Sequence, residues 1–138
     1  MAIDVGSIYE QFEKICLDFP NKPALIYLGK KYNFSQLREA TESLAASLHR
    51  LGVAKGDKAV LYLPNCPQWT IAWLALMRIG VIAIPISPIY TPIDLKYMAN
   101  DSGAETIFCL DTNFGYVTQV LPETRLKRVI VTNFAEVL

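Results

Sequence analysis

The sequence predicts an α/β fold in which a parallel, doubly wound sheet of βαβ units follows an N-terminal helix and a β-hairpin. From Lys58 onward, apolar runs of strand length alternate with helical patterns, which is typical of right-handed βαβ units. The runs are continuously apolar, as expected when helices cover both faces of a sheet. With 138 residues, 52% of them hydrophobic, the chain can bury one substantial core. We therefore expect residues 1–138 to form a single domain.

The N-terminal segment predicts a helix followed by a hairpin. Ser7 and Glu10 have the spacing of a capping box, which begins a helix. The apolar face of this helix is predicted to consist of Ile8, Phe12, Ile15, Cys16 and Phe19. Residues 24–34 then alternate about a predicted tight turn at Gly29-Lys30, the pattern of a β-hairpin.

A second helix follows the hairpin. Asn33 and Gln36 are predicted to cap it, and Gly52 with Val53 predicts a Schellman ending. Its apolar stripe is predicted to be Leu37, Ala40, Leu44, Ala45, Leu48 and Leu51.

The remaining sequence predicts a flavodoxin-like alternation of strands and helices. The expected strands cover residues 58–64, 81–85, 106–110 and 128–132, and the expected helices cover 67–79, 91–100 and 114–121. Pro85 is predicted to end the pairing of its strand, because proline lacks the N–H of a sheet ladder. Pro88 and Pro92 should keep the following connection extended, either as a lid over the core or as one wall of a crevice.

Ligands of such sheets bind at the carboxyl ends of the strands. In this sequence those ends are Pro64-Asn65, Pro85 to Pro88, Asp111-Thr112 and Thr132-Asn133. They offer hydrogen-bonding groups but few acids, bases or nucleophiles. The glycines are also too far apart to form a phosphate cradle.

Charge and hydropathy argue against a nucleic-acid partner and against a membrane-spanning segment. Thirteen basic and thirteen acidic side chains cancel, which argues against a nucleic-acid groove. The tightest basic group, Arg125, Lys127 and Arg128, is predicted to be a solvated edge. The uncharged run from Ala59 to Met77 is interrupted by prolines and polar residues, so no transmembrane segment is predicted, and no signal peptide is recognised.

The residues most capable of chemistry are few. Cys16, Cys66 and Cys109 have neither a metal-binding nor a disulfide spacing, which favours the reducing cytosol. Cys66 is expected to be the thiol nearest the surface, without a base to activate it. His49 is predicted to be exposed or packed at a helix end.

Four aromatic and apolar side chains have helical spacing along the predicted helix 67–79. They are Trp69, Trp73, Leu76 and Met77. Such a stripe is expected to form core rather than a cofactor site.

Several stretches together resemble the opening of adenylate-forming (AMP-binding) enzymes, which include acyl-CoA synthetases. The matching motifs are "FSQL", "GVAKGD", "LPN" and "GVIAIPISPIYTPIDLKYMANDSGA". Gln36 stands where the family usually has Glu, and Ser87 where it usually has Asn. The "PIYTPIDL" form is similar to that of the long-chain-fatty-acid–CoA ligase branch.

The resemblance implies that the chain is the N-terminal scaffold piece of an ATP-dependent acid–CoA ligase and is inactive by itself. The intact enzyme would use ATP, Mg and CoA to convert a fatty acid into acyl-CoA through an acyl-adenylate. The family's phosphate loop, ribose-binding Asp and catalytic Lys have no counterpart in this sequence. We therefore assign no catalytic, cofactor-binding or metal-ligating residue and no cofactor to the chain itself.

Two alternatives stay open from the residues alone. The first is a stand-alone flavodoxin-like module that binds a small molecule, and the second is an interaction protein with the same fold. The ligase interpretation predicts an exposed apolar face that contacts the remainder of the parent enzyme and promotes self-association. The expected location is the cytoplasm, with peripheral membrane contact left open, although no basic amphipathic helix favours it.

Overall fold

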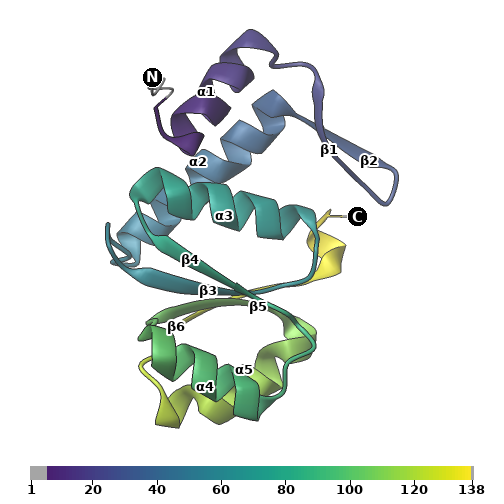
Figure 1. Cartoon of the computed structure of the whole chain (residues 1–138). Coiled ribbons are helices and arrows are strands. Elements are labelled where there is room, and N and C mark those ends of the chain that lie inside the picture. The colour runs from purple at the N-terminus through teal and green to yellow at the C-terminus, as the bar shows by residue number, and fades with distance from the viewer. Residues whose placement is uncertain (1–5, 138) are drawn as a thin grey trace, which may run out of the picture.

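The computed structural model describes residues 6–137, and Figure 1 shows how their elements are arranged. The helices are α1 (Ile8–Asp18), α2 (Phe34–Arg50), α3 (Pro67–Ile79), α4 (Pro92–Ser102) and α5 (Phe114–Val120). The strands are β1 (Pro23–Tyr27), β2 (Lys30–Asn33), β3 (Lys58–Tyr62), β4 (Ile82–Ile86), β5 (Thr106–Leu110) and β6 (Arg128–Thr132). Short 3-10 helices occupy Asp111–Asn113, Leu121–Glu123 and Phe134–Val137.

The central sheet is parallel and has the strand order β4-β3-β5-β6. The chain runs from β3 outward to β4 and then crosses back to β5 on the other side, so the winding direction reverses between β3 and β5. This arrangement confirms the predicted doubly wound α/β fold. The separate hairpin β1–β2 pairs antiparallel, as expected.

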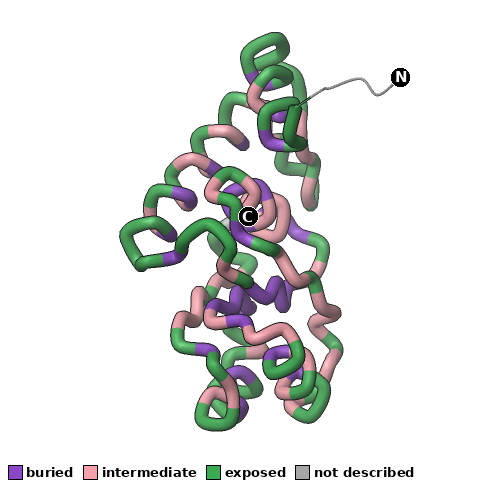
Figure 2. The backbone as a smooth tube through the Cα atoms, turned by 60° about the vertical axis from the view of Figure 1, so that its left-hand side comes forward, coloured by how far each residue is buried: buried purple, intermediate pink, exposed green. Residues whose placement is uncertain are grey.

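Helices cover both faces of the sheet (Figure 1). Successive side chains of each strand point to opposite faces of the sheet. Leu61 and Phe108 pack with α2 and α3 on one face. Val60 and Ile107 pack with α4 and α5 on the other. In Figure 2 the buried residues accordingly gather along the strands in the middle of the molecule. Burial on both faces explains why these strands are continuously apolar in sequence.

A third apolar cluster attaches α1 and the hairpin to α2 and α3. Its buried members are Tyr9, Phe12, Cys16, Leu37 and Leu74. Above the cluster, the Arg78 guanidinium of α3 donates to the Tyr9 hydroxyl at 3.1 Å and lies 3.3 Å from a Glu13 carboxylate oxygen. The Tyr9 and Leu74 side chains were not among the residues predicted to be core.

The predicted apolar faces of α1 and α2 are partly wrong. Ile8, Ile15 and Phe19 are 59%, 40% and 45% exposed, because α1 buries a narrow stripe centred on Tyr9, Phe12 and Cys16. In α2, Leu51 is exposed because the helix has already ended there. Thr41 takes a buried position of the stripe instead.

The hairpin turn lies one residue earlier than predicted. Tyr27 pairs with Lys30, so the two turn residues are Leu28 and Gly29, with φ of 48° and 83°. Two positive φ values fit the twist of a two-residue hairpin. The glycine is therefore the second turn residue rather than the first.

Pro85 lies within β4 and does not end its pairing. The ladder continues to Ile86, which is opposite Tyr62 of β3. The Ile82 N–H donates to the Asp57 carbonyl on the β3 side. Since N–H directions alternate along a strand, the Pro85 nitrogen faces the open edge of the sheet, where no ladder hydrogen bond is lost.

The predicted helix caps are confirmed. Ser7 with Glu10 and Asn33 with Gln36 form reciprocal capping boxes. At the end of α2 the Val53 N–H donates to the Leu48 carbonyl at 3.0 Å, the bond that defines a Schellman ending.

Candidate functional site

The carboxyl ends of β3 and β4 enclose an open depression of about 530 Å³. Its walls combine the turn after β3, the first residues of α3 and the proline segment after β4. The lining residues are Leu63, Pro64, Asn65, Trp69, Pro85, Ile86, Ser87, Pro88, Tyr90 and Met98. Two of the strand ends singled out in the sequence thus meet here, and the proline segment forms one wall of a crevice.

A buried hydrogen-bond network holds that wall in place. Tyr62, fully buried at the end of β3, donates its hydroxyl to the Tyr90 carbonyl at 2.5 Å. The Asn113 amide donates to the Tyr62 hydroxyl and to the Pro88 carbonyl, both at 3.2 Å. Because burial removes the phenol from water, the pKa of Tyr62 is raised, so its hydroxyl stays protonated and keeps donating.

The sequence did not single out Tyr62 or Asn113. The apolar run around Tyr62 concealed its hydroxyl, which is the one polar side-chain group on that strand apart from Lys58. The position of Asn113, just beyond the end of β5, was the available signal, because side chains after parallel strands meet at the same edge.

The end of β6 is tied to α3 rather than to the depression. The Gln68 amide donates to the Thr132 hydroxyl at 3.3 Å and to the Asn133 carbonyl at 3.0 Å. The fourth predicted strand end therefore anchors the sheet against α3 and leaves the crevice to β3 and β4.

Cys66 is buried, contrary to the expectation that it lies near the surface. It is the N-cap of α3, and its neighbour Asn65 takes the exposed position of the turn. Burial raises the pKa of the Cys66 thiol, which disfavours the reactive thiolate. Cys16 and Cys109 are also buried, free thiols.

The predicted core stripe on α3 is confirmed in part. Leu76 is fully buried, while Trp69 and Trp73 are half-buried and stacked with their ring centroids 6.0 Å apart. Trp69 consequently contributes to both the core and the wall of the depression.

The remaining chemically capable residues lie away from this depression. His49 is exposed near the end of α2. Arg128 is not a solvated edge residue as predicted, because it donates to the Leu51 and Gly52 carbonyls at 2.9 and 3.3 Å. Arg128 thereby supplies hydrogen-bond donors to carbonyl groups at the carboxyl end of α2. Arg125 and Lys127, in contrast, are exposed.

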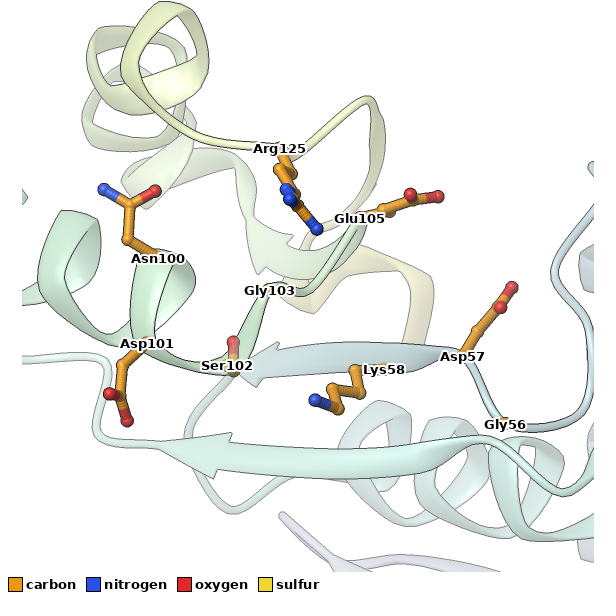
Figure 3. Close-up of a pocket in the computed structure, with 9 residues that line it drawn as sticks. All are labelled: Gly56, Asp57, Lys58, Asn100, Asp101, Ser102, Gly103, Glu105 and Arg125. Carbon is orange, nitrogen blue, oxygen red and sulfur yellow. The ribbon is translucent and has the colours of Figure 1, made fainter.

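A second depression of about 490 Å³ lies at the opposite, amino ends of the strands (Figure 3). Lys58 reaches it from the start of β3, Arg125 from the loop before β6, and Asp101 from the end of α4. Glu105, which also lines it, forms an ion pair with Lys127 at 2.9 Å. Mixed charges on exposed side chains are typical of a solvated surface, so we place the candidate site at the carboxyl ends.

Comparison with known proteins identifies the family. A family model described as "AMP-binding enzyme" matches residues 12–137. The chain belongs to the AMP-binding enzyme family. The chain is 35% identical, over 135 residues, to a long-chain-fatty-acid–CoA ligase of Yersinia pestis. The match covers 96% of this chain but only 24% of the relative, so the chain spans about a quarter of the relative's length.

Other AMP-binding enzymes agree in sequence and fold. The chain is 30% identical over 118 residues to 4-coumarate–CoA ligase 1 of Arabidopsis thaliana, covering 84% of this chain and 20% of that protein. The crystal structure of a long-chain-fatty-acid–CoA ligase from Archaeoglobus fulgidus superimposes with a TM-score of 0.86 and 28% identity. That match covers 91% of this chain and 27% of the other.

The carboxyl-end depression by itself does not suit a Mg-nucleotide. The lining of the carboxyl-end depression contains no Lys, Arg, Asp or Glu to meet phosphates or a cation. Within residues 6–137, no three His, Cys, Asp or Glu side chains are grouped so that they could hold a metal ion. We derive no reaction step through ATP or Mg²⁺ from these residues.

Proposed function

We propose that this chain forms the N-terminal part of an acid–CoA ligase that converts a fatty acid, ATP and CoA into acyl-CoA, AMP and pyrophosphate through an acyl-adenylate. The observation that carries the proposal is the 35% identity, across nearly the whole chain, to a relative named long-chain-fatty-acid–CoA ligase. The fold likeness to the Archaeoglobus fulgidus ligase supports the same assignment.

Within such an enzyme, we assign this chain a scaffold role. Tyr62 and Asn113 fix the proline segment, and the depression beside it presents apolar side chains with the polar groups of Asn65 and Ser87. These residues suit the border of an apolar substrate better than phosphate chemistry. ATP, Mg²⁺ and CoA would be held by residues outside these 138, and the chain alone is expected to be inactive.

A chimera tests the proposal. The matching quarter of the Yersinia pestis ligase is replaced by residues 1–138, and acyl-CoA formation from a fatty acid, ATP and CoA is measured. The chimera is expected to be active, whereas the same ligase with that quarter deleted and the isolated 138-residue chain are both inactive. A folded chimera that forms neither acyl-adenylate nor acyl-CoA would contradict the proposal.

A second candidate function is a small-molecule binding module that acts alone. It is favoured by one observation, which is that the carboxyl-end depression is formed entirely within this chain. Calorimetric titration of the isolated chain with a fatty acid, with ATP and with CoA separates the candidates. Saturable binding of one of them, together with an inactive chimera, would favour the module.

We also propose a cytoplasmic location and a single folding unit over residues 1–138. All three cysteines are free and buried, which suits a reducing compartment. The third apolar cluster joins α1 and the hairpin to the helices that cover the sheet, which supports one cooperative unit. Within residues 6–137 no helix combines the length and apolar character needed to span a bilayer.

A further inference from the structure

The tip of the β1–β2 hairpin carries apolar side chains that do not join the core. Ile26 and Leu28 are 67% and 72% exposed. Figure 1 shows the hairpin projecting beside α2, at the end of the molecule opposite α4. Lys31 lies opposite Ile26, and Lys30 lies opposite Tyr27. Cross-strand partners share a face of the ribbon, so each face has one lysine next to the tip.

Leu28 occupies a backbone conformation that leucine disfavours. Its φ is +48°, and among residues 6–137 Leu28 is the one residue other than glycine that has a positive φ. Two-residue turns of this kind favour Asn or Asp followed by Gly, because a Cβ and a branched side chain crowd the backbone at positive φ. Leu28 therefore serves neither the turn nor the core. Such a strained, exposed position is a reason to look for a binding role.

The hairpin is also locally basic in a chain with no net charge. The stretch from Phe19 to Arg38 contains four cations and no Asp or Glu. Among the residues that the structure describes, Lys22, Lys30 and Lys31 form no ion pair. Lys22 and Lys30 lie over the rings of Phe19 and Tyr32, 4.3 and 5.1 Å from the ring centroids. Because aromatic rings do not cancel a charge, the positive charge of the three lysines is available to an anionic surface.

We propose that the hairpin tip, defined as Ile26, Leu28, Lys30 and Lys31, docks on an anionic lipid bilayer. The two apolar side chains would enter the boundary between headgroups and acyl chains, and the lysines would meet the lipid phosphates. The apolar pair favours a bilayer over a nucleic acid, whose phosphate backbone offers these side chains no apolar environment. The proposal does not rest on the proposed ligase activity.

Co-sedimentation of the 138-residue chain with vesicles tests the proposal. Binding to phosphatidylcholine vesicles containing phosphatidylglycerol is expected, with little binding to pure phosphatidylcholine and weaker binding at high salt. Replacing Lys30 and Lys31 by Gln should weaken binding about fivefold per lysine, or about 30-fold together. Leu28→Asn should weaken it by about tenfold, since it removes one of the two apolar side chains that enter the bilayer.

Leu28→Asn also separates docking from folding. Because Asn suits the positive φ, the variant should unfold at the same or a higher temperature than the wild type while binding vesicles less. Two controls match the changes elsewhere. Ile93→Asn replaces an 82% exposed apolar residue on α4, and a Lys58→Gln, Arg125→Gln double variant removes two cations from the amino-end depression. Neither control should alter vesicle binding.

The proposal is overturned if Leu28→Asn binds vesicles like the wild type, since the contact would then not involve the tip. It is also overturned if both vesicle types are bound equally or not at all. Binding to single-stranded RNA that is as tight as binding to anionic vesicles, and is unaffected by Leu28→Asn, would identify a nucleic-acid surface instead.

Discussion

Replacing Tyr62 by Phe removes one buried hydroxyl and nothing else from the network that holds the wall of the carboxyl-end depression. The hydroxyl donates to the Tyr90 carbonyl at 2.5 Å and accepts from the Asn113 amide at 3.2 Å. Without it, the Tyr90 carbonyl loses this donor, whereas Asn113 keeps its bond to the Pro88 carbonyl. The ring still fills its place, so the change isolates the hydrogen bonds from the packing.

The expected cost follows from leaving a buried acceptor unpaired, which is about 1–3 kcal/mol. For a domain of 138 residues, each kcal/mol lowers the melting temperature by roughly 3 °C. Tyr62→Phe should therefore melt about 3–10 °C below the wild type. Hydrogen exchange of the Tyr90 amide, which donates to the Ser87 carbonyl, should speed up as the proline segment loosens.

A double-mutant cycle with Asn113→Ala completes the assay, using urea unfolding followed by far-ultraviolet circular dichroism. Since the two side chains share one network, the two losses should be non-additive by about 0.5 kcal/mol or more. Additive losses, or a Tyr62→Phe variant as stable as the wild type, would refute the idea that this network holds the wall.

Three further results are expected. Burial raises the pKa of the Cys109 thiol to about 11 from its ordinary value near 9. The free energy of unfolding should therefore hold up to about pH 9 and fall as the pH rises through about 11. An equally steep fall for Cys109→Ala, measured by urea unfolding at each pH, would contradict this. Gly80→Ala should destabilise the fold by about 1–2 kcal/mol, because the φ of Gly80 is +76° and a Cβ there would lie 2.9 Å from Lys55 Cγ. The control Gly115→Ala should instead stabilise the α5 helix by about 0.5 kcal/mol, and thermal melts measure both. The isolated chain should self-associate through its exposed apolar side chains, and a concentration-independent sedimentation coefficient would count against that expectation.

Local chemistry made the element ends predictable from the sequence. The capping boxes at Ser7 and Asn33 and the Schellman ending at Gly52 each depend on residues within a few positions of one another. The parallel, doubly wound sheet was predictable for a related reason, because continuously apolar strands separated by helices admit few other topologies.

Contacts between distant segments were less predictable. Whether Tyr9 or Ile8 faces inward on α1 depends on the position of Arg78, which is far away in the sequence. The hairpin turn was misplaced because leucine at positive φ is disfavoured, so Leu28 did not look like a turn residue. The sequence predicted where the carboxyl-end site lies. It did not predict the contact between Tyr62 and Asn113, because 51 positions separate these two residues.

Pro85 makes the two edges of the central sheet unequal as places where a further strand could pair. Its nitrogen occupies an outward position of β4, so an incoming strand would find no N–H there and could not complete a ladder. The outer edge of β6 contains no proline and keeps the backbone groups that a ladder needs. A strand that extends this sheet, whether from the same polypeptide or another one, is therefore expected to add beside β6, on the side away from the carboxyl-end depression.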